Sequence, residues 1–295
     1  MMELLKEFEE YLKENYSGDE KENTIKNYLS DVKQFFNYYK EEFGEIISDF
    51  NHIEITEYKN YMKNTKSYKY TTINRKIASL SIYDNFMIEK KDKKAKAVKK
   101  SDFTKIVRPY ISADMLPRNE IKKVKVKAAR TNIRDYAIFV LLNEGGLRVS
   151  ELTNIEIDRD LDVKNRRLYV LGKGNKLRGI IITDNMLEAI NEYIPERNKI
   201  LGKRTNKYLF ISNKTVNTGK AITRNSINNM LNKYCDELKI PRFNPHIFRH
   251  DFGTTSYELG YSELFLKNQM GDSSNAINIY IHPGKENLLE ISNKR

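Results

Sequence analysis

Residues 246–250 read His-Ile-Phe-Arg-His and directly follow Pro245. A proline is common where a helix begins, and the i,i+3 spacing places His246 and Arg249 on one helix face. A helix N-terminus attracts anions, and a histidine beside an arginine suits a phosphoryl group. Taken alone, this stretch fits a histidine that only caps the helix equally well.

A second stretch, residues 146–152, reads Gly-Leu-Arg-Val-Ser-Glu-Leu. An apolar helix is predicted over residues 134–142, and Gly145-Gly146 is a suitable stop for it. Arg148 then stands at a helix junction, where Glu151 can orient it by a charge-assisted hydrogen bond. An ordinary surface arginine with an i,i+3 partner is the simpler interpretation of this pattern on its own.

A hairpin is predicted between these two stretches. Residues 167–171 and 177–182 are short β-rich runs, joined by Gly-Lys-Gly-Asn-Lys at 172–176. The two glycines let the backbone approach a ligand closely, and a hairpin tip is exposed. Lys173 in this turn can reach a phosphate or a leaving oxygen and donate a proton. The alternative is a lysine that merely keeps the turn soluble.

The rest of the chain predicts a mainly α protein of two domains. Residues 1–100 form an all-helical domain, with helices in the regions of residues 4–12, 25–39, 53–62 and 71–88 and a cap at Asn23 or Thr24 for the second. Residues 112–295 form a mixed, mostly helical domain with a small antiparallel sheet. Its further predicted helices are 184–194 capped by Asp184, 223–238 capped by Thr223, 246–259, 262–270 and 275–281.

Charge points to a polyanionic partner. The chain holds 52 Lys and Arg against 40 Asp and Glu, a net charge of +12. Nucleic acid is the first candidate partner and an anionic membrane surface the second; a coding bias toward Lys and Asn is the alternative explanation. Residues 89–101 have too little apolar surface to fold and are predicted to be a solvated linker. The lysines expected to contact a phosphate backbone there are Lys90, Lys91, Lys93, Lys94, Lys96, Lys99 and Lys100.

Composition excludes several classes of protein. One cysteine, Cys235, rules out an intrachain disulfide and a zinc-finger cluster, and four histidines leave little for a metal site. No run approaches the ~20 apolar residues of a spanning helix, and the acidic, amphipathic start is unlike a secretory signal. We therefore expect an intracellular protein, located in the cytoplasm, with no metal site.

Five residues complete the pattern: Arg148, Lys173 on the hairpin, His246 and Arg249, and Tyr280 within Ile-Asn-Ile-Tyr-Ile-His at 277–282. By count alone Tyr280 is one of 19 tyrosines and a core residue. In this order and spacing, however, the five residues resemble the tyrosine recombinase (phage integrase) family, most closely its Xer-like and transposon-integrase members. The resemblance covers the chain from end to end, with a core-binding (SAM-like) domain first and a catalytic domain from about residue 112.

The resemblance implies a site-specific DNA recombinase. Tyr280 would attack a scissile phosphate and form a 3′-phosphotyrosyl link. Arg148 and Arg249 would bind the nonbridging oxygens, His246 would assist at the phosphate or at Tyr280, and Lys173 would protonate the leaving 5′-oxygen. The reaction conserves the phosphodiester energy, so no cofactor, ATP or metal is implied. The partners implied are double-stranded DNA sites and three further copies in a homotetramer, with strands exchanged through a Holliday junction and no membrane.

One position departs from the family pattern. Where a second His or a Trp is usual, this chain has Asp272, and a carboxylate repels a phosphate unless it is protonated or paired. Asp272 therefore keeps open the alternative of a DNA-binding member with impaired catalysis. A relaxing enzyme of the type IB topoisomerase kind is a second alternative, because that class shares the Arg-Lys-Arg-His-Tyr set. The C-terminal tail, with Leu288, Leu289 and Ile291, is expected to pack either on a neighbouring copy or back on its own chain.

Overall fold

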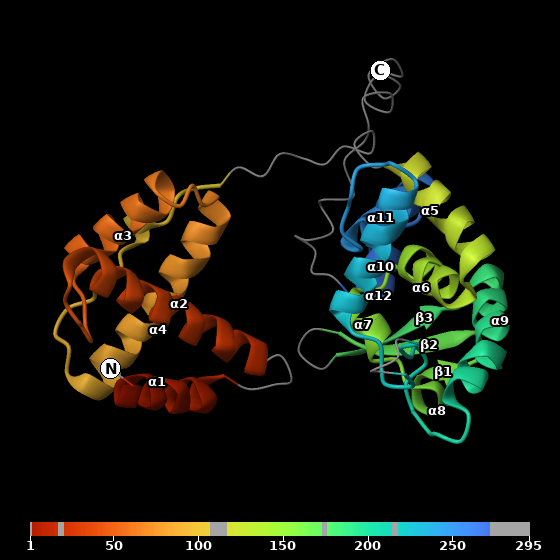
Figure 1. The fold of residues 1–295 in the computed structure, drawn as a ribbon, viewed down its shortest axis with the longest axis horizontal. Coiled ribbons are helices and arrows are strands. Elements are labelled where there is room, and N and C mark those ends of the chain that lie inside the picture. Colours follow the sequence, from red (N-terminus) through yellow and green to blue (C-terminus); the bar gives the residue numbers. More distant parts are fainter. Residues whose placement is uncertain (1, 17–20, 107–116, 173–175, 214–217, 272–295) are drawn as a thin grey trace, which may run out of the picture. The chain divides into compact units, whose positions relative to one another are not determined.

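The computed structural model describes residues 2–16, 21–106, 117–172, 176–213 and 218–271 (Figure 1). The chain divides into two compact units, Met1–Pro109 and Tyr110–Arg295. Most of the described residues are helical, and a three-stranded antiparallel sheet lies in the second unit. The predicted fold class is therefore confirmed. No helix in the described ranges has both the length and the apolar character needed to cross a membrane.

The first unit is helical because four amphipathic segments share one aromatic core. Phe8 packs edge-on against Tyr83, with ring centroids 5.0 Å apart, and Phe35 packs in the same way against Tyr58 at 5.1 Å. Such pairs stabilise the core beyond the apolar area that they bury. The second helix begins before the cap expected at Asn23 or Thr24. The helices are α1 (Met2–Asn15), α2 (Lys21–Phe43), α3 (His52–Asn64) and α4 (Tyr70–Lys91).

The lysine-rich segment is the main correction to the sequence prediction. Residues 89–101 are not a solvated linker: the segment begins inside α4 and ends in a 3₁₀ turn, η1 (Lys100–Asp102). Between these points Ala97 and Val98 are buried, each 4% exposed. The buried carboxylate of Asp84 on α4 accepts their backbone N–H groups at 2.7 and 3.0 Å. A few small apolar residues and one buried acceptor therefore hold the segment to the unit.

The lysines of this segment are not equivalent. Lys93 is 10% exposed at its side chain, with Nζ 2.8 Å from Asp84 Oδ1 and 2.6 Å from Asp49 Oδ1. The proposed contact of Lys93 with DNA is therefore wrong, because its ammonium is already held by two carboxylates. Lys90 and Lys91 belong to α4. The exposed lysines Lys90, Lys91, Lys94, Lys96, Lys99 and Lys100 keep the predicted role as a proposal.

The second unit is built around α6 (Ile133–Glu144), which packs against α5 (Arg118–Thr131), α9 (Asp184–Leu201) and α11 (His246–Glu258). Residues 137–142 of α6 are all fully buried, which explains why this part of the helix is apolar on every side. The remaining helices of this unit are α7 (Val149–Thr153), α8 (Ile157–Asp160), α10 (Arg224–Glu237) and α12 (Glu263–Met270).

The predicted hairpin is present. Strand β2 (Arg167–Leu171) pairs with β3 (Leu177–Ile181) in the register Leu168↔Ile180, and β1 (Leu161–Asp162) extends the sheet on the other side of β2. Leu168, Val170 and Ile180 are buried against the helices. The two β-rich runs and the turn between them therefore placed this hairpin correctly.

Both ends of α9 differ from the prediction. Thr183, not Asp184, caps α9, with its hydroxyl accepting the Met186 N–H at 3.2 Å. The helix also continues beyond residue 194, through Pro195, to Leu201. The reason is tertiary: Arg197 is 5% exposed and donates to backbone carbonyls of a neighbouring segment, which anchors the last turns.

Candidate functional site

Arg148 lies at the start of α7, directly after a tight turn. Gly146 in this turn has φ +59°, in the left-handed region that favours glycine. A Cβ on Gly146 would lie 2.5 Å from Cδ1 of Phe252 on α11, so any side chain would collide with that helix. The turn therefore packs closely against α11. The side chain of Arg148, which follows the turn, is 29% exposed to solvent.

Glu151 holds Arg148 in two ways. Its Oε2 accepts the Arg148 backbone N–H at 2.8 Å, and its Oε1 accepts Arg148 Nη1 at 2.8 Å. The carboxylate is 3% exposed at the side chain. The predicted pairing of these two residues is therefore present in the structure. Because the carboxylate accepts hydrogen bonds from both the backbone N–H and the guanidinium of Arg148, it fixes the direction in which this side chain points.

A third residue, which the sequence analysis did not single out, completes this ion cluster. Arg178 on β3 donates to both oxygens of Glu151, with Nη1 at 2.7 Å and Nη2 at 2.8 Å. Its Nε donates to the carbonyl of Gln269 in α12 at 3.0 Å. The signal available in the sequence was one arginine inside an otherwise apolar strand, Leu-Arg-Gly-Ile-Ile at 177–181. Strand alternation alone does not say that its partner is Glu151.

The ionisation of Glu151 follows from this cluster. Burial alone would raise the pKa of the Glu151 carboxyl, but the hydrogen bonds and charge of Arg178, and then those of Arg148, outweigh it. The pKa of Glu151 is therefore held below its usual value. The group is a carboxylate at neutral pH, so two arginines share one negative charge and the cluster keeps a net positive charge.

Arg249 is the fourth residue of α11 and is fully buried. Its Nη1 donates to the carbonyl of Gly146, and its Nη2 donates to the carbonyl of Met270 at 2.7 Å. The guanidinium therefore lies between the turn that precedes Arg148 and the last residue of α12. Three predicted site residues, Arg148, Glu151 and Arg249, are thus gathered around one turn of the backbone.

His246 is the first residue of α11 and is exposed. Its ring packs edge-to-face against the ring of His250, with centroids 4.7 Å apart. The i,i+4 relation places both rings on the same side of the helix. His246 and Arg249 are one helical turn apart, as the spacing predicted.

Lys173, Asp272, Tyr280 and the predicted helix over residues 275–281 lie outside the described residues, but the residues directly before Lys173 and Asp272 are described. Gly172, directly before Lys173, donates its N–H to the Lys176 carbonyl at 2.9 Å and so closes the base of the hairpin. Gly271, directly before Asp272, ends α12 with φ +66°. The structure therefore describes the chain up to the residue directly before Lys173 and up to the residue directly before Asp272.

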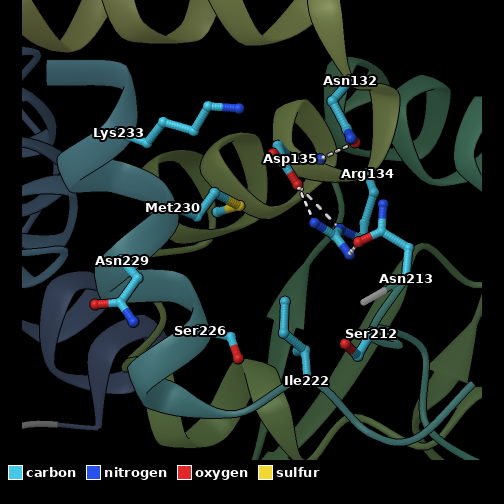
Figure 2. Close-up of a pocket in the computed structure, with 10 residues that line it drawn as sticks. All are labelled: Asn132, Arg134, Asp135, Ser212, Asn213, Ile222, Ser226, Asn229, Met230 and Lys233. Atoms are coloured by element: carbon cyan, nitrogen blue, oxygen red, sulfur yellow. Dashed lines mark hydrogen bonds and ion pairs between the residues drawn. The ribbon is translucent and has the colours of Figure 1, made fainter. Parts of the chain in front are cut away.

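A separate polar pocket of about 260 Å³ lies between α6, α10 and the segment around residue 212 (Figure 2). Arg134 is its main charged group, 9% exposed, and donates from Nε and Nη2 to Asp135 at 2.9 and 2.7 Å. Its Nη1 donates to Asn213 Oδ1 at 2.9 Å. Arg134 thus ties the start of α6 to the 211–213 segment, and the pocket shares no lining residue with the Arg148–Glu151–Arg178 cluster.

Residues 114–287 match the phage integrase family, and residues 5–91 match the phage integrase N-terminal SAM-like domain. The chain belongs to the phage integrase family. The family that the sequence pattern indicated is therefore confirmed, including its N-terminal helical domain.

Individual relatives agree with this assignment. The chain is 29% identical to the TnP I resolvase of Bacillus thuringiensis, over 99% of both proteins. It is 30% identical to the tyrosine recombinase XerC of Caldanaerobacter subterraneus subsp. tengcongensis, over 92% of this chain and 81% of the relative. In structure it resembles the XerA recombinase, with a TM-score of 0.53, 25% identity, and coverage of 99% and 97%. It shares its fold with the Tn1549 transposon integrase in complex with transposon right end DNA, with a TM-score of 0.72, 19% identity, and coverage of 99% and 98%.

Proposed function

We propose that this protein is a site-specific DNA recombinase that cleaves and rejoins DNA strands through Tyr280. The observation that carries the proposal is the convergence of Arg148 and Arg249. The guanidinium of Arg249 binds the carbonyl of Gly146, which is 103 residues away in sequence and two residues before Arg148. Two arginines from distant segments at one turn are suited to bind one phosphate from two sides.

In the proposed reaction the Tyr280 oxygen attacks the scissile phosphorus and the 5′-oxygen leaves, so one P–O bond forms as another breaks. Charge on the nonbridging oxygens develops toward Arg148 and Arg249, which are already oriented by Glu151 and by backbone carbonyls. His246 assists at the phosphate or at the Tyr280 hydroxyl, and Lys173 donates a proton to the leaving oxygen. The 3′-phosphotyrosyl bond conserves the energy that the free 5′-hydroxyl of a second strand uses to rejoin the DNA.

Covalent trapping tests this chemistry. Wild type, Tyr280→Phe and a control variant, Tyr208→Phe, are incubated with nicked suicide duplexes made from the DNA that flanks the gene. Denaturing gels are then scored for protein–DNA bands. We expect an SDS-stable band with wild type and Tyr208→Phe that is absent with Tyr280→Phe. A band that persists in Tyr280→Phe would show that another residue is the nucleophile.

The same assay separates the two alternatives. Tight binding without any covalent band would favour an impaired DNA-binding protein and direct attention to Asp272. Covalent cleavage and relaxation of supercoiled DNA, without exchange between two sites, would favour a topoisomerase-like enzyme. The resemblance to recombinases over nearly the whole chain supports strand exchange.

We further propose that four copies assemble on two duplexes through the C-terminal tail. An apolar groove of about 370 Å³ lies on the second unit between the ends of α6 and β3 and the helices α11 and α12. Its lining includes Phe252, Leu259 and Phe265, and Leu259 is 72% exposed. A surface of this kind suits apolar side chains such as Leu288 and Leu289 of a neighbouring copy.

Light scattering of protein–DNA complexes tests the assembly. Wild type is expected to bring two duplexes into one complex, whereas Leu288→Asp is expected to stop at a single duplex. A variant that still assembles would contradict the proposed tail contact. If the tail instead packs on its own chain, Leu288→Asp will lower the melting temperature of the free protein.

A further inference from the structure

The side chain of Arg178 touches several parts of the site. It binds the carboxylate of Glu151 through both terminal nitrogens and the carbonyl of Gln269 through Nε. It also lies against two glycines: a Cβ on Gly172 would be 3.2 Å from Nη1, and a Cβ on Gly271 would be 3.0 Å from Cδ. These glycines directly precede Lys173 and Asp272.

The contact with α12 concerns the end of that helix. The last carbonyls of a helix have no partner within it and need donors from elsewhere. Arg178 supplies one to Gln269, and Arg249 supplies one to Met270. Arg178 and the fully buried Arg249 therefore bind the last carbonyls of α12, and the chain that follows carries Tyr280 nine residues after Gly271.

The charge of Arg178 has a second consequence. Without it, Arg148 and Glu151 would form a neutral pair, and Glu151 would cancel much of the attraction of Arg148 for a phosphate. With Arg178 present, the Glu151 carboxylate accepts three guanidinium hydrogen bonds and one backbone hydrogen bond, and one positive charge remains. Glu151 can then orient Arg148 without neutralising it.

We propose that Arg178 is a positioning residue for DNA cleavage: it balances Glu151, so that Arg148 stays oriented and cationic, and it anchors the end of α12. This inference rests on the recombinase function proposed above. Arg178 acts through Glu151 and through the α12 carbonyl, not by contact with the phosphate. All three of its nitrogens are engaged by these two partners.

The test is a double-mutant cycle on cleavage. The single-turnover rate of covalent complex formation on a suicide duplex is measured for wild type, Arg178→Met, Arg178→Lys, Glu151→Gln and the double variant Glu151→Gln/Arg178→Met. Arg167→Met is the control, because Arg167 is an exposed arginine on the neighbouring strand β2. DNA affinity and melting temperature are measured for each protein.

We expect Arg178→Met to bind DNA within about threefold of wild type and to cleave about 100-fold more slowly, because small displacements of reacting groups have effects of that size. Arg178→Lys keeps the charge but not the paired donors, and it should recover part of the rate. The double variant should cleave no more slowly than Arg178→Met, because removing the Glu151 charge also removes the need to balance it. Arg167→Met should cleave like wild type.

Other results would overturn the inference. If the two substitutions multiply in the double variant, Arg178 acts independently of Glu151. If Arg178→Met cleaves at the wild-type rate, Arg178 has no role in cleavage. If Arg178→Met fails to fold but Arg178→Lys and the double variant both cleave at the wild-type rate, Arg178 is a structural residue only. Absence of a covalent complex with wild type itself would count against the proposed function instead.

Discussion

Replacement of Asp84 by alanine tests whether the lysine-rich segment belongs to the first unit or is a solvated linker. Asp84 is fully buried on α4 and accepts the N–H groups of Ala97 and Val98. It also pairs with Lys93, whose Nζ lies 2.8 Å from Oδ1. The substitution removes all of these contacts and leaves α4 otherwise unchanged.

The expected effect is large because the acceptor is charged and buried. Each hydrogen bond to a charged group contributes about 1.5–3 kcal/mol, so the two backbone contacts together hold the segment with about 3–6 kcal/mol. A tenfold change in an equilibrium corresponds to about 1.4 kcal/mol. The backbone amides of the segment should therefore exchange with solvent at least about 100-fold faster in Asp84→Ala than in wild type.

Hydrogen exchange with mass spectrometry on the full chain measures this directly, in peptides that cover residues 92–103. Asn85→Ala is the matched control. The Asn85 side chain lies next on the same helix and accepts an exposed hydrogen bond from Lys96 at 2.7 Å, so its loss should change exchange less than about fivefold. Fast exchange of this segment already in wild type would refute the reasoning and restore the solvated linker.

Three further predictions concern the second unit. Lys173→Ala should lower the cleavage rate about 10²–10⁴-fold on ordinary DNA and far less on a duplex with a 5′-bridging sulfur, because a thiolate leaves without a proton; an equal deficit on both would argue against Lys173 as the acid. Gly146→Ala should lower the free energy of unfolding by about 2–4 kcal/mol in urea titrations, since it combines a left-handed φ with a collision at Phe252; an unchanged midpoint would contradict this. The lowered pKa of Glu151 stabilises the folded state above the ordinary value of 4.5, and this contribution is lost as pH falls through the folded pKa. The difference in melting temperature between wild type and Glu151→Gln should therefore narrow as pH falls below 4.5, and a constant difference would mean that Arg178 and Arg148 do not shift that pKa.

Helices and strands with a strong periodic pattern could be predicted from the sequence. The apolar run that forms α6 stops at Gly145 as expected, and Thr223 caps α10 with its hydroxyl accepting the Ser226 N–H at 3.1 Å. The hairpin strands lie within one residue of their predicted ends. In each case the signal is local: a change of period, a glycine or a capping hydroxyl.

The prediction of a solvated linker at residues 89–101 was wrong because the group that holds this segment lies outside it. Nothing within residues 89–101 marks Ala97 and Val98 as buried, and the acceptor that holds them is Asp84, in the preceding helix. The same reason explains α9, whose last turns depend on carbonyls of residues 208 and 209 that bind Arg197.

The sequence by itself determined the family, the order of Arg148, Lys173, His246, Arg249 and Tyr280, and the pairing of Glu151 with Arg148, which is only three residues away. Only the tertiary structure decided that Arg178 shares Glu151 and that Arg249 binds the carbonyl before Arg148. Local residue type and spacing fix helix faces and turns, because they act over one or two turns of backbone. Contacts between segments that are tens of residues apart depend on how the helices and the sheet pack, and that packing sets the charge and direction of the arginines.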